Sequence, residues 1–449
     1  MNLIESTQFY IKEVSINAKG GPPFQITDLI EEISLYDNLF MPVLSGHILI
    51  SDTSRLIDRI TLIDDVIQIH ITKMVDDEFA SFKKAFRIYS ITDRKNINNT
   101  SEAYIMHFVA EELKQSDRQT VSKSYDSTYS EVVENILKQN LNVDRSNIAI
   151  VEKSSGIRRI NVNNLRPLDA LEWCAKRALS SKNSPDFLFF ANRTGYNFAS
   201  LSKLLTQSSI LNINFSPKNL SNGDEFFELS KARSFEVLSQ FDAISKLRSG
   251  ADSGTFIGFD PITRTMGAKP ISGDQTYKNM EHGNKKQVTN TVINPDGTSN
   301  KTDYDSKRTL SINSERRKIS DYIKKKDPTS VSKDEKQEMF LHQRQTILNN
   351  LMQKRLKIVM PGNFQLSSGF NVTVDASGFS ARTKGEDVNM DKSLSGKYII
   401  TGTRHIIGLR SHVTIIEIAT DSTNDSRTLV SSSNQKEALN QYDKPIRAI

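Results

Sequence analysis

The chain has 449 residues, a length that predicts about three or four domains and a hydrophobic core that needs no cross-links. Its single cysteine, Cys174, excludes an internal disulfide, and its place in a helix-like pattern indicates a packed small side chain. The sequence has no run of about 20 apolar residues, and its N-terminus lacks the basic start and apolar centre of a signal peptide. We therefore expect a soluble protein that is made and assembled in a reducing cytoplasm and does not insert into a membrane.

The net charge of +6 is concentrated in one segment of the chain. Between Lys269 and Lys357 there are 19 Lys and Arg residues against 11 Asp and Glu, whereas the rest of the chain has 40 against 42. The same segment is rich in Asn, Ser, Thr and Gly, which is typical of loops. It is therefore predicted to be an insertion that is partly loop.

The N-terminal region, residues 8–112, has mainly the alternating pattern of β-strands. Apolar or small side chains occupy every second position from Leu44 to Ile50, and Val66 to Ile71 alternate in the same way. Turns are marked by the pair of glycines and prolines at 20–23 and by Pro42. This pattern predicts a half-buried antiparallel sheet or barrel.

The next region, residues 117–204, changes to a mixed pattern. Thr128 and Glu131 form a capping box ahead of helically spaced apolar residues, and a second helix is predicted to begin at Pro167. Residues 187–190 and 196–198 flank a turn and predict a β-hairpin. We expect a small α+β module here.

The remainder of the chain is predicted to hold both helices and strands. One helix is expected from Ser234 to about Arg248, where Gly250 ends it, and another after a capping box of Ser332 and Glu335. Strands are predicted at 210–215, 255–259, 262–265, 356–360, 370–374, 398–407 and 413–419. The last four of these strands predict a second barrel.

The two β regions resemble each other. Tyr89–Arg94 and Tyr398–Arg404 both begin Tyr-x-Ile-Thr and contain an Arg, and residues 105–112 match 415–421 in alternation and in their acidic end. An alternating strand precedes each hairpin, at 64–71 and at 368–374. The pattern predicts two copies of one barrel unit, although any two β-hairpins share some of this alternation.

A duplicated barrel has a consequence for assembly. Three chains with two similar barrels each present six nearly equivalent units around one axis, so a trimer can mate with a sixfold ring. Strand pairing between neighbouring barrels would also close the ring and leave no open sheet edge.

Several stretches of the chain resemble the baseplate hub family of contractile-tailed bacteriophages. They are residues 35–52, 166–181, 187–201, 356–363, 394–407 and 417–422. None is a catalytic signature, and the resemblance lies in their order and spacing through most of the chain. The insertion at 269–327 has no family pattern, and its role is open.

The resemblance implies a homotrimeric hollow cylinder between a hexameric tail tube and a trimeric central spike, within the virion tail baseplate. Expected partners are further copies of the chain, the spike, tail tube or tube-initiator proteins, other baseplate proteins and DNA that passes through the lumen during ejection. The polar residues 422–443 follow the second barrel, so the spike is expected to be a separate chain. A hub of a related contractile injection system is the alternative.

The expected fold is α+β and mostly β, with two similar antiparallel, tail-tube-like β-barrels. We divide the chain into a first barrel at 1–115, the α+β module at 116–205, a second barrel at 206–235 and 351–425, an inserted helical and basic polar segment at 236–350, and a polar tail at 426–449.

An enzyme, for example one that degrades cell walls, is the first rival interpretation. The histidines form no metal-binding motif, and adjacent carboxylates such as Asp64 and Asp65 or Glu111 and Glu112 point to opposite faces of a strand, so they suit edges or turns better than catalysis. Residues 250–254 lack the Lys-Ser/Thr of a phosphate loop. The histidines are His47, His70, His107, His282, His342, His405 and His412. We expect no catalytic residue, no cofactor and no metal.

A nucleic-acid-binding protein is the second rival, based on the basic cluster from Arg316 to Lys326. Only Tyr304 and Tyr322 lie near it, which is too few aromatic residues for a base-stacking surface. A channel wall that bound phosphates would hinder the passage of DNA. We therefore expect this cluster to face outward, toward solvent or an acidic partner. A membrane-piercing component is disfavoured because no basic amphipathic helix with an aromatic face is present.

Overall fold

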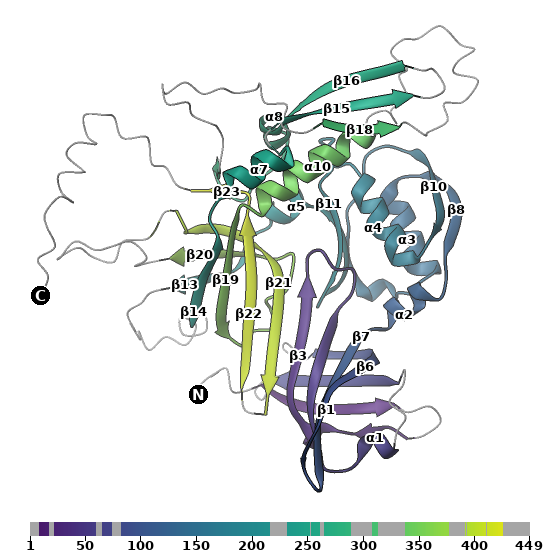
Figure 1. The fold of residues 1–449 in the computed structure, drawn as a ribbon, viewed down its shortest axis with the longest axis vertical. Helices are drawn as coiled ribbons and strands as arrows, with labels where there is room; N and C mark the ends of the chain where they lie inside the picture. The colour runs from purple at the N-terminus through teal and green to yellow at the C-terminus, as the bar shows by residue number, and fades with distance from the viewer. Residues whose placement is uncertain are drawn as a thin grey trace, which may run out of the picture.

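The fold is that of a computed structural model, in which strands dominate and most helices lie at one end (Figure 1). The structure describes residues 9–17, 22–59, 65–73, 82–215, 231–251, 253–260, 265–288, 308–312, 337–376, 391, 393–409 and 411–424. The predicted class, α+β and mostly β, is confirmed. Among these residues no helix is both long and apolar enough to cross a bilayer.

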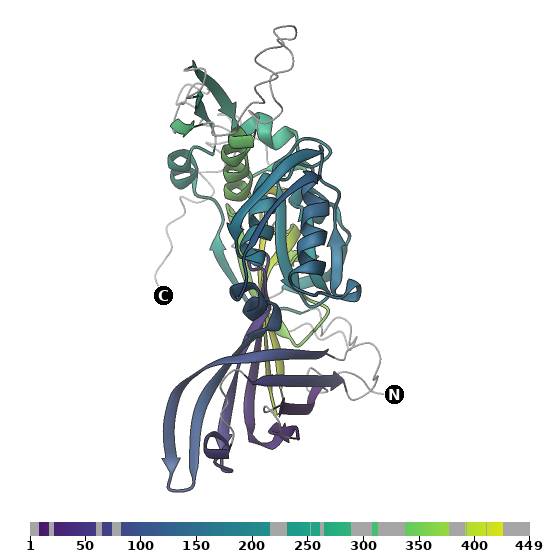
Figure 2. The ribbon, with the colours of Figure 1, turned by 90° about the vertical axis from the view of Figure 1, so that its right-hand side faces the viewer.

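The first sheet is antiparallel throughout, with the strand order β3-β4-β7-β6-β5-β1 and the short β2 paired to β1. Its strands are β1 (Phe9–Asn17), β2 (Phe24–Gln25), β3 (Ile30–Asn38), β4 (Ser45–Asp52), β5 (Val66–Lys73), β6 (Phe82–Asn98) and β7 (Ser101–Ala110). The short helices η1 (Thr27–Leu29) and α1 (Leu56–Arg59) connect them. The β6–β7 hairpin is long and projects from the lower end of the molecule (Figure 2).

The second sheet has the strand order β14-β19-β22-β21-β20-β13. Its strands are β13 (Ser209–Phe215), β14 (Ser234–Ser239), β19 (Lys354–Pro361), β20 (Asn371–Ala376), β21 (Gly396–Gly408) and β22 (His412–Thr420). The two sheets share a topology. In the first sheet the β6–β7 hairpin lies between β4 and β5, and in the second sheet the β21–β22 hairpin lies between β19 and β20. The two sheets differ at one end, because β13 is parallel to β20 whereas β1 is antiparallel to β5.

Backbone pairing gives a residue-by-residue correspondence between the sheets. β6 has an irregularity between Ile88 and Ser90 in its pairing with β7, and β21 has one between Ile400 and Gly402 in its pairing with β22. Such bulges bend and twist the strand that carries them. The shared position of the bulge makes Ile88 the counterpart of Ile400.

This register corrects one part of the repeat inferred from sequence. Phe86 and Tyr398 occupy the same place in their strands, and both are almost completely buried. Tyr89, which the sequence pattern aligned with Tyr398, is 62% exposed. The shared Tyr-x-Ile-Thr pattern was therefore three residues out of register, because alternation alone does not reveal a bulge. The match of 105–112 with 415–421 is in register.

The two sheets are joined edge to edge inside the chain. The second part of β21 pairs with β3 in antiparallel fashion, with Gly402 opposite Asn38 and Gly408 opposite Glu32. The two sheets thereby form one sheet of 13 strands, including β2. We call this pairing the internal junction. It brings residues from the two ends of the chain side by side (Figure 1).

An α+β module lies between β7 and β13 in the chain. The capping box of Thr128 and Glu131 begins α3, and Pro167 begins α4, as predicted. The module consists of α2 (Glu111–Asp117), β8 (Val121–Ser127), α3 (Tyr129–Gln139), η2 (Arg145–Asn147), β9 (Ile148–Val151), β10 (Arg158–Leu165), α4 (Pro167–Arg177), β11 (Phe187–Asn192), β12 (Gly195–Ser200) and α5 (Leu201–Thr206). The predicted hairpin of β11 and β12 is confirmed.

The segment between β14 and β19 contains more strand than predicted. The helix expected from Ser234 to Arg248 is wrong in its first half, because residues 234–239 form β14 and pair with β19. The helix begins only after Asp242, whose side chain caps it. The elements are α7 (Ala243–Ser249), β15 (Ser253–Asp260), β16 (Thr265–Ser272), α8 (Gly273–Lys278), β17 (Lys286–Gln287), β18 (Arg308–Ile312) and α10 (Gln337–Leu351), and β17 pairs with β23 (Ser422–Thr423). The capping box of Ser332 and Glu335 lies outside the described residues.

Three clusters of buried apolar side chains form the core. One fills the first sheet and continues into the module, with Phe86, Phe108 and Leu171 among its members. A second fills the inner face of the second sheet around Ile358 and Ile418. The third joins the module to the second sheet and to α10. The module and α10 therefore cover one end of the joined sheet and hold it in place.

Candidate assembly surface

The joined sheet has one face that packs on the core and an opposite face that remains polar. Side chains alternate along each strand, so the register identifies which residues share the polar face. We call this face the open face; it includes Glu32, Tyr36, His47, Thr92, His107, Glu236, Lys357, Arg404 and Glu417. It extends from β6 across the internal junction to β14.

Arg404 connects the two sheets at the centre of the open face. Its guanidinium donates a hydrogen bond to Ser34 Oγ at 3.1 Å and lies 3.6 Å from Glu32 Oε1. It also lies over the ring of Tyr36, 5.6 Å from the centroid. All three partners belong to β3, so the contacts of Arg404 link β21 of the second sheet to the first sheet.

Two histidines face each other on the first sheet. The rings of His47 and His107 are 5.8 Å apart, with Tyr36 Oη 3.2 Å from His47 Nδ1 and Thr92 Oγ1 2.8 Å from His107 Nε2. Burial, and then the positive charges of Arg404 and His107, lower the pKa of His47. The lowered pKa keeps His47 mainly neutral at pH 7.

Acidic and basic side chains alternate on the second sheet. Lys357 Nζ lies 3.5 Å from Glu236 Oε2, and Lys357 is opposite Glu417 in the pairing of β19 with β22. Among the described residues of β14, β19 and β22 on the open face, Lys357 therefore lies between two acidic side chains. A surface of this kind neither repels nor binds a polyanion strongly.

On the covered side of the internal junction, one buried carboxylate ties three segments together. Asp37 of β3 accepts hydrogen bonds from Thr403 Oγ1 of β21, from Ser367 Oγ and, at 3.0 Å, from the backbone N–H of Ser368. The pKa of Asp37 is raised, because burial outweighs the lowering effect of these hydrogen bonds. Ser367 and Ser368 also contact the β11–β12 hairpin of the module, through Arg193 N–H and Asn192 Nδ2.

Replacing Asp37 tests this tie. In Asp37→Ala three buried donors lose their acceptor, and we expect a loss of about 3 kcal/mol in the free energy of unfolding, measured by urea denaturation. Asp37→Asn retains one oxygen acceptor and should lose less. Asp28→Ala, at an exposed position in η1, is the matched control and should change stability by less than about 0.5 kcal/mol. Equal effects of Asp37→Ala and Asp28→Ala would contradict the role of Asp37.

A buried aromatic cluster lies beside Asp37. His405 Nδ1 is 3.1 Å from Thr414 Oγ1 and 3.3 Å from His412 Nε2, and both histidine rings contact the ring of Phe364. Burial lowers the pKa of His405 to about 4 and that of His412 to about 2. A side chain at Gly362 would overlap the ring of His412, with its Cβ only 2.0 Å from Cγ. Both histidines are neutral structural groups in this cluster.

These histidines should make the protein less stable in acid. Above pH about 6.5 both are neutral in the folded and unfolded states, so they add no pH dependence. Below pH about 6.5 both histidines become protonated in the unfolded state. In the folded state they stay neutral down to pH about 4 for His405 and about 2 for His412. The free energy of unfolding should therefore fall by about 1.4 kcal/mol per histidine per pH unit below 6.5.

The measurement is urea denaturation at pH 7 and pH 5, with His405→Gln/His412→Gln as the comparison. The raised pKa of Asp37 acts with the opposite sign, but it is common to both proteins. The double variant should show a smaller fall in stability between the two pH values. An equal fall in both proteins would mean that other groups cause the acid sensitivity.

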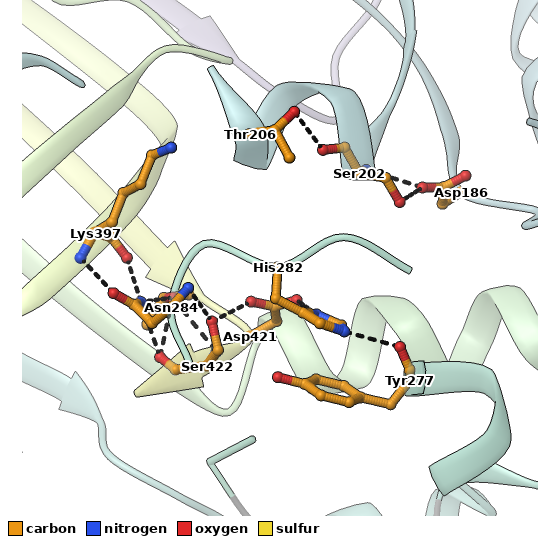
Figure 3. A network of polar contacts seen from close by, with 10 residues as sticks. Asp186, Ser202, Thr206, Tyr277, His282, Asn284, Lys397, Asp421 and Ser422 are labelled. Carbon is orange, nitrogen blue, oxygen red and sulfur yellow. Dashed lines mark hydrogen bonds and ion pairs between the residues drawn. The ribbon is translucent and has the colours of Figure 1, made fainter. Parts of the chain in front are cut away.

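A polar network fastens the insertion to the end of the second sheet (Figure 3). His282 Nδ1 lies 2.6 Å from Asp421 Oδ2, and its ring stacks on Tyr277. Asn284 Nδ2 donates to the carbonyl of Lys397 at 2.9 Å, and Asn284 Oδ1 accepts from the Lys397 N–H at the same distance. The loop after α8 therefore continues the strand pairing of β21 through a side chain.

The structure brings four of the histidines together in two pairs. His47 pairs with His107 and His405 with His412, because β4 lies beside β7 and β21 beside β22. His47 and His107 are far apart in the sequence, so spacing held no signal for that pair, whereas His405 and His412 lie in one hairpin. Within the described residues, no group of three or more His, Cys, Asp or Glu side chains is placed to hold a metal ion.

The other sequence candidates also have structural positions. Glu111 begins α2 and its Oε2 lies 2.6 Å from Arg87 Nε, whereas Asp65 is 1% exposed, so its interpretation as an edge or turn solubiliser is wrong. Gly250 ends α7 in a left-handed conformation with φ of 78°, ahead of β15. A phosphate loop has the opposite order, from strand to helix. The basic cluster 316–326, Tyr304 and Tyr322 lie outside the described residues.

No protein-family model and no curated protein matches the chain. Among solved structures, the 43 kDa tail protein of prophage MuSo2 from Shewanella oneidensis is 8% identical, with a TM-score of 0.51 and coverage of 91% of this chain and 98% of that chain. A tail protein from Neisseria meningitidis MC58 is 11% identical, with a TM-score of 0.49 over 92% and 97% of the two chains. A type VI secretion component from E. coli is 9% identical, with a TM-score of 0.41 over 93% and 79%.

The similarity to the MuSo2 tail protein covers nearly the whole of both chains. The chain therefore has the fold of a phage tail protein. At 8% identity the likeness concerns the fold and not individual residues. The order of the stretches that resembled the baseplate hub family is consistent with it.

Proposed function

We propose that this chain is the structural hub of a contractile tail baseplate, a trimeric hollow ring that adapts a sixfold tail tube to a threefold spike. The observation that carries the proposal is the pair of sheets with one strand order, joined edge to edge in a single chain. The tail-protein fold supports it. The proposed division into two barrels, a module, an insertion and a C-terminal tail is the one that the sequence predicts.

The internal junction supports a ring because it defines a head-to-tail contact. The free part of β21 in the second sheet pairs with the edge strand β3 of the first sheet. These two strands are not counterparts of each other, so the contact is head-to-tail and not twofold symmetric. Repeating such a contact produces a closed ring when the rotation is right. Six sheets from three chains would present sixfold symmetry to the tube, while the modules and insertions keep the threefold symmetry of the spike.

The open face suits the wall of a bore through which DNA passes. Its charges are mixed in sign, and its histidine at position 47 is kept neutral at pH 7 by burial and by Arg404. A polyanion therefore meets no continuous basic surface that would retain it. In this proposal the opposite side, with the module, faces outward toward other baseplate proteins.

In this proposal the protein has a structural role and is not an enzyme. It belongs to the tail baseplate of a virion that is assembled in the host cytoplasm. Its proposed partners are further copies of itself, the spike, the tube or tube-initiator proteins and other baseplate proteins. A hub of a related contractile injection system is the second candidate, because a type VI secretion component is among the similar structures. In such a machine the bore carries no genome.

The oligomeric state tests the proposal. Light scattering after size-exclusion chromatography should give a trimer for the full chain, alone or after coexpression with the spike, and electron microscopy should show a ring with a central hole. A peptidoglycan-cleavage assay on the same sample is expected to be negative. A monomer in both preparations, or a compact particle without a hole, would contradict a hub.

The open face can be tested by changing its charge. Glu417 is exposed and lies opposite Lys357, so Glu32→Lys/Glu417→Lys turns the balanced face basic. The affinity of the ring for duplex DNA, measured by fluorescence anisotropy, should rise at least about tenfold at physiological salt, since about four units of charge are added per chain. Asp144→Lys, at an exposed position of the module, is the control and should have little effect.

The opposite result has a clear meaning. If the unaltered ring already binds DNA tightly, and Lys357→Ala or Arg404→Ala removes that binding, the open face grips DNA and does not let it pass freely.

A further inference from the structure

Two sheet edges have no strand beside them among the described residues. β14 pairs only with β19 and is the last strand of the joined sheet. Beyond Ser90, β6 pairs with β7 on one side and with no described strand on the other. Exposed apolar side chains mark both edges: Tyr89 is 62% and Ile97 59% exposed on β6, and Val237 and Leu238 are each 36% exposed on β14. Open edges of this kind readily pair with another strand.

The internal repeat shows what each edge corresponds to. β6 occupies in the first sheet the place that β21 occupies in the second, and β3 corresponds to β14. The chain of partners Ser34, His47, His107 in the first sheet matches Glu236, Lys357, Glu417 in the second. The two edges are therefore the counterparts of the two strands that meet in the internal junction.

From this equivalence we infer that β14 of one chain pairs with β6 of a second copy, antiparallel and in the register that β3 adopts on β21. The partner is a second copy of the chain, because β14 and β6 of the same chain cannot lie side by side. Within one chain the two edges lie on opposite sides of the internal junction (Figure 1). The inference rests on the proposed ring and names the contact that closes it.

The register follows from the internal junction once a bulge in β6 is counted. In the junction Ile406 lies opposite Ser34. The counterpart of Ser34 is Glu236. The counterpart of Ile406 is Lys95, because Ile406 pairs with a residue of β22 and Lys95 pairs with the corresponding residue of β7. The inferred contact therefore places Lys95 of one chain opposite Glu236 of the next.

The chemistry of these positions agrees with the register. Both side chains project from the same face of their sheets, since Lys95 is opposite Ala103 and Glu236 is opposite Lys357. Lys95 is exposed, and the side chain of Glu236 is 58% exposed. A cross-strand pair of opposite charge favours this register, and a slip by one residue would separate the charges onto opposite faces.

Cysteine cross-linking tests the register directly in the full-length chain, coexpressed with its spike if the spike is needed for assembly. Cys174 is buried, and burial raises its pKa to about 12, so it can remain. Under oxidation Lys95→Cys/Glu236→Cys should give covalent dimers and trimers on a denaturing gel, with trimer as the main species. Lys95→Cys/Val237→Cys, shifted by one residue, should remain unlinked. Lys95→Cys alone should form no dimer.

Charge reversal provides an independent readout without oxidation. Lys95→Glu and Glu236→Lys should each reduce the trimer in light scattering at low salt, and the double variant should recover it. Circular dichroism of each variant checks that the fold is intact, which is expected because both positions are exposed.

Each result separates the contact from the proposed function. A trimer with a central hole, in which the 95/236 pair does not link and charge reversal is not rescued, overturns the inferred edge pairing but leaves the hub intact. Dimers from Lys95→Cys alone would show a twofold contact and overturn it as well. A chain that stays monomeric with its spike overturns both.

Discussion

The antiparallel pairing of β21 with β3 is the constraint on which the rest of the molecule depends. It joins the two ends of the described chain, and it aligns two sheets of the same strand order into one surface. Main-chain hydrogen bonds fix the spacing of the two sheets, while Asp37 and Arg404 fix their register from the covered and the open side. A slip of one residue would move Asp37 from its buried donors to the open face.

Much of this arrangement was predictable from sequence, because alternation and helix caps are local signals. Thr128 and Pro167 begin their helices as predicted, and the strands predicted at 398–407 and 413–419 lie within β21 and β22. The helix expected from Ser234 failed because a short amphipathic segment satisfies both periods, and only pairing with β19 decides in favour of the strand.

The candidate surface was less accessible to sequence reasoning. The repeat was visible, but the bulges at Tyr89 and Thr401 identify a correspondence that differs by three residues from the one inferred from sequence. The pair His47–His107 depends on which strands are neighbours, and the edges of the joined sheet depend on its complete order. These are non-local properties, and a single sequence contains no periodic signal for them.

The internal junction and the inferred contact between copies differ in what supports them. The internal junction is reinforced by the β11–β12 hairpin, which binds Ser367 and Ser368, and by the buried cluster around His405. The β6–β14 contact involves a projecting hairpin and an edge strand with exposed side chains. Its weaker support lets each chain fold first and join later. A head-to-tail contact can also grow into an open filament, so in the proposed hub a threefold spike that gathers three chains would favour closure of the ring.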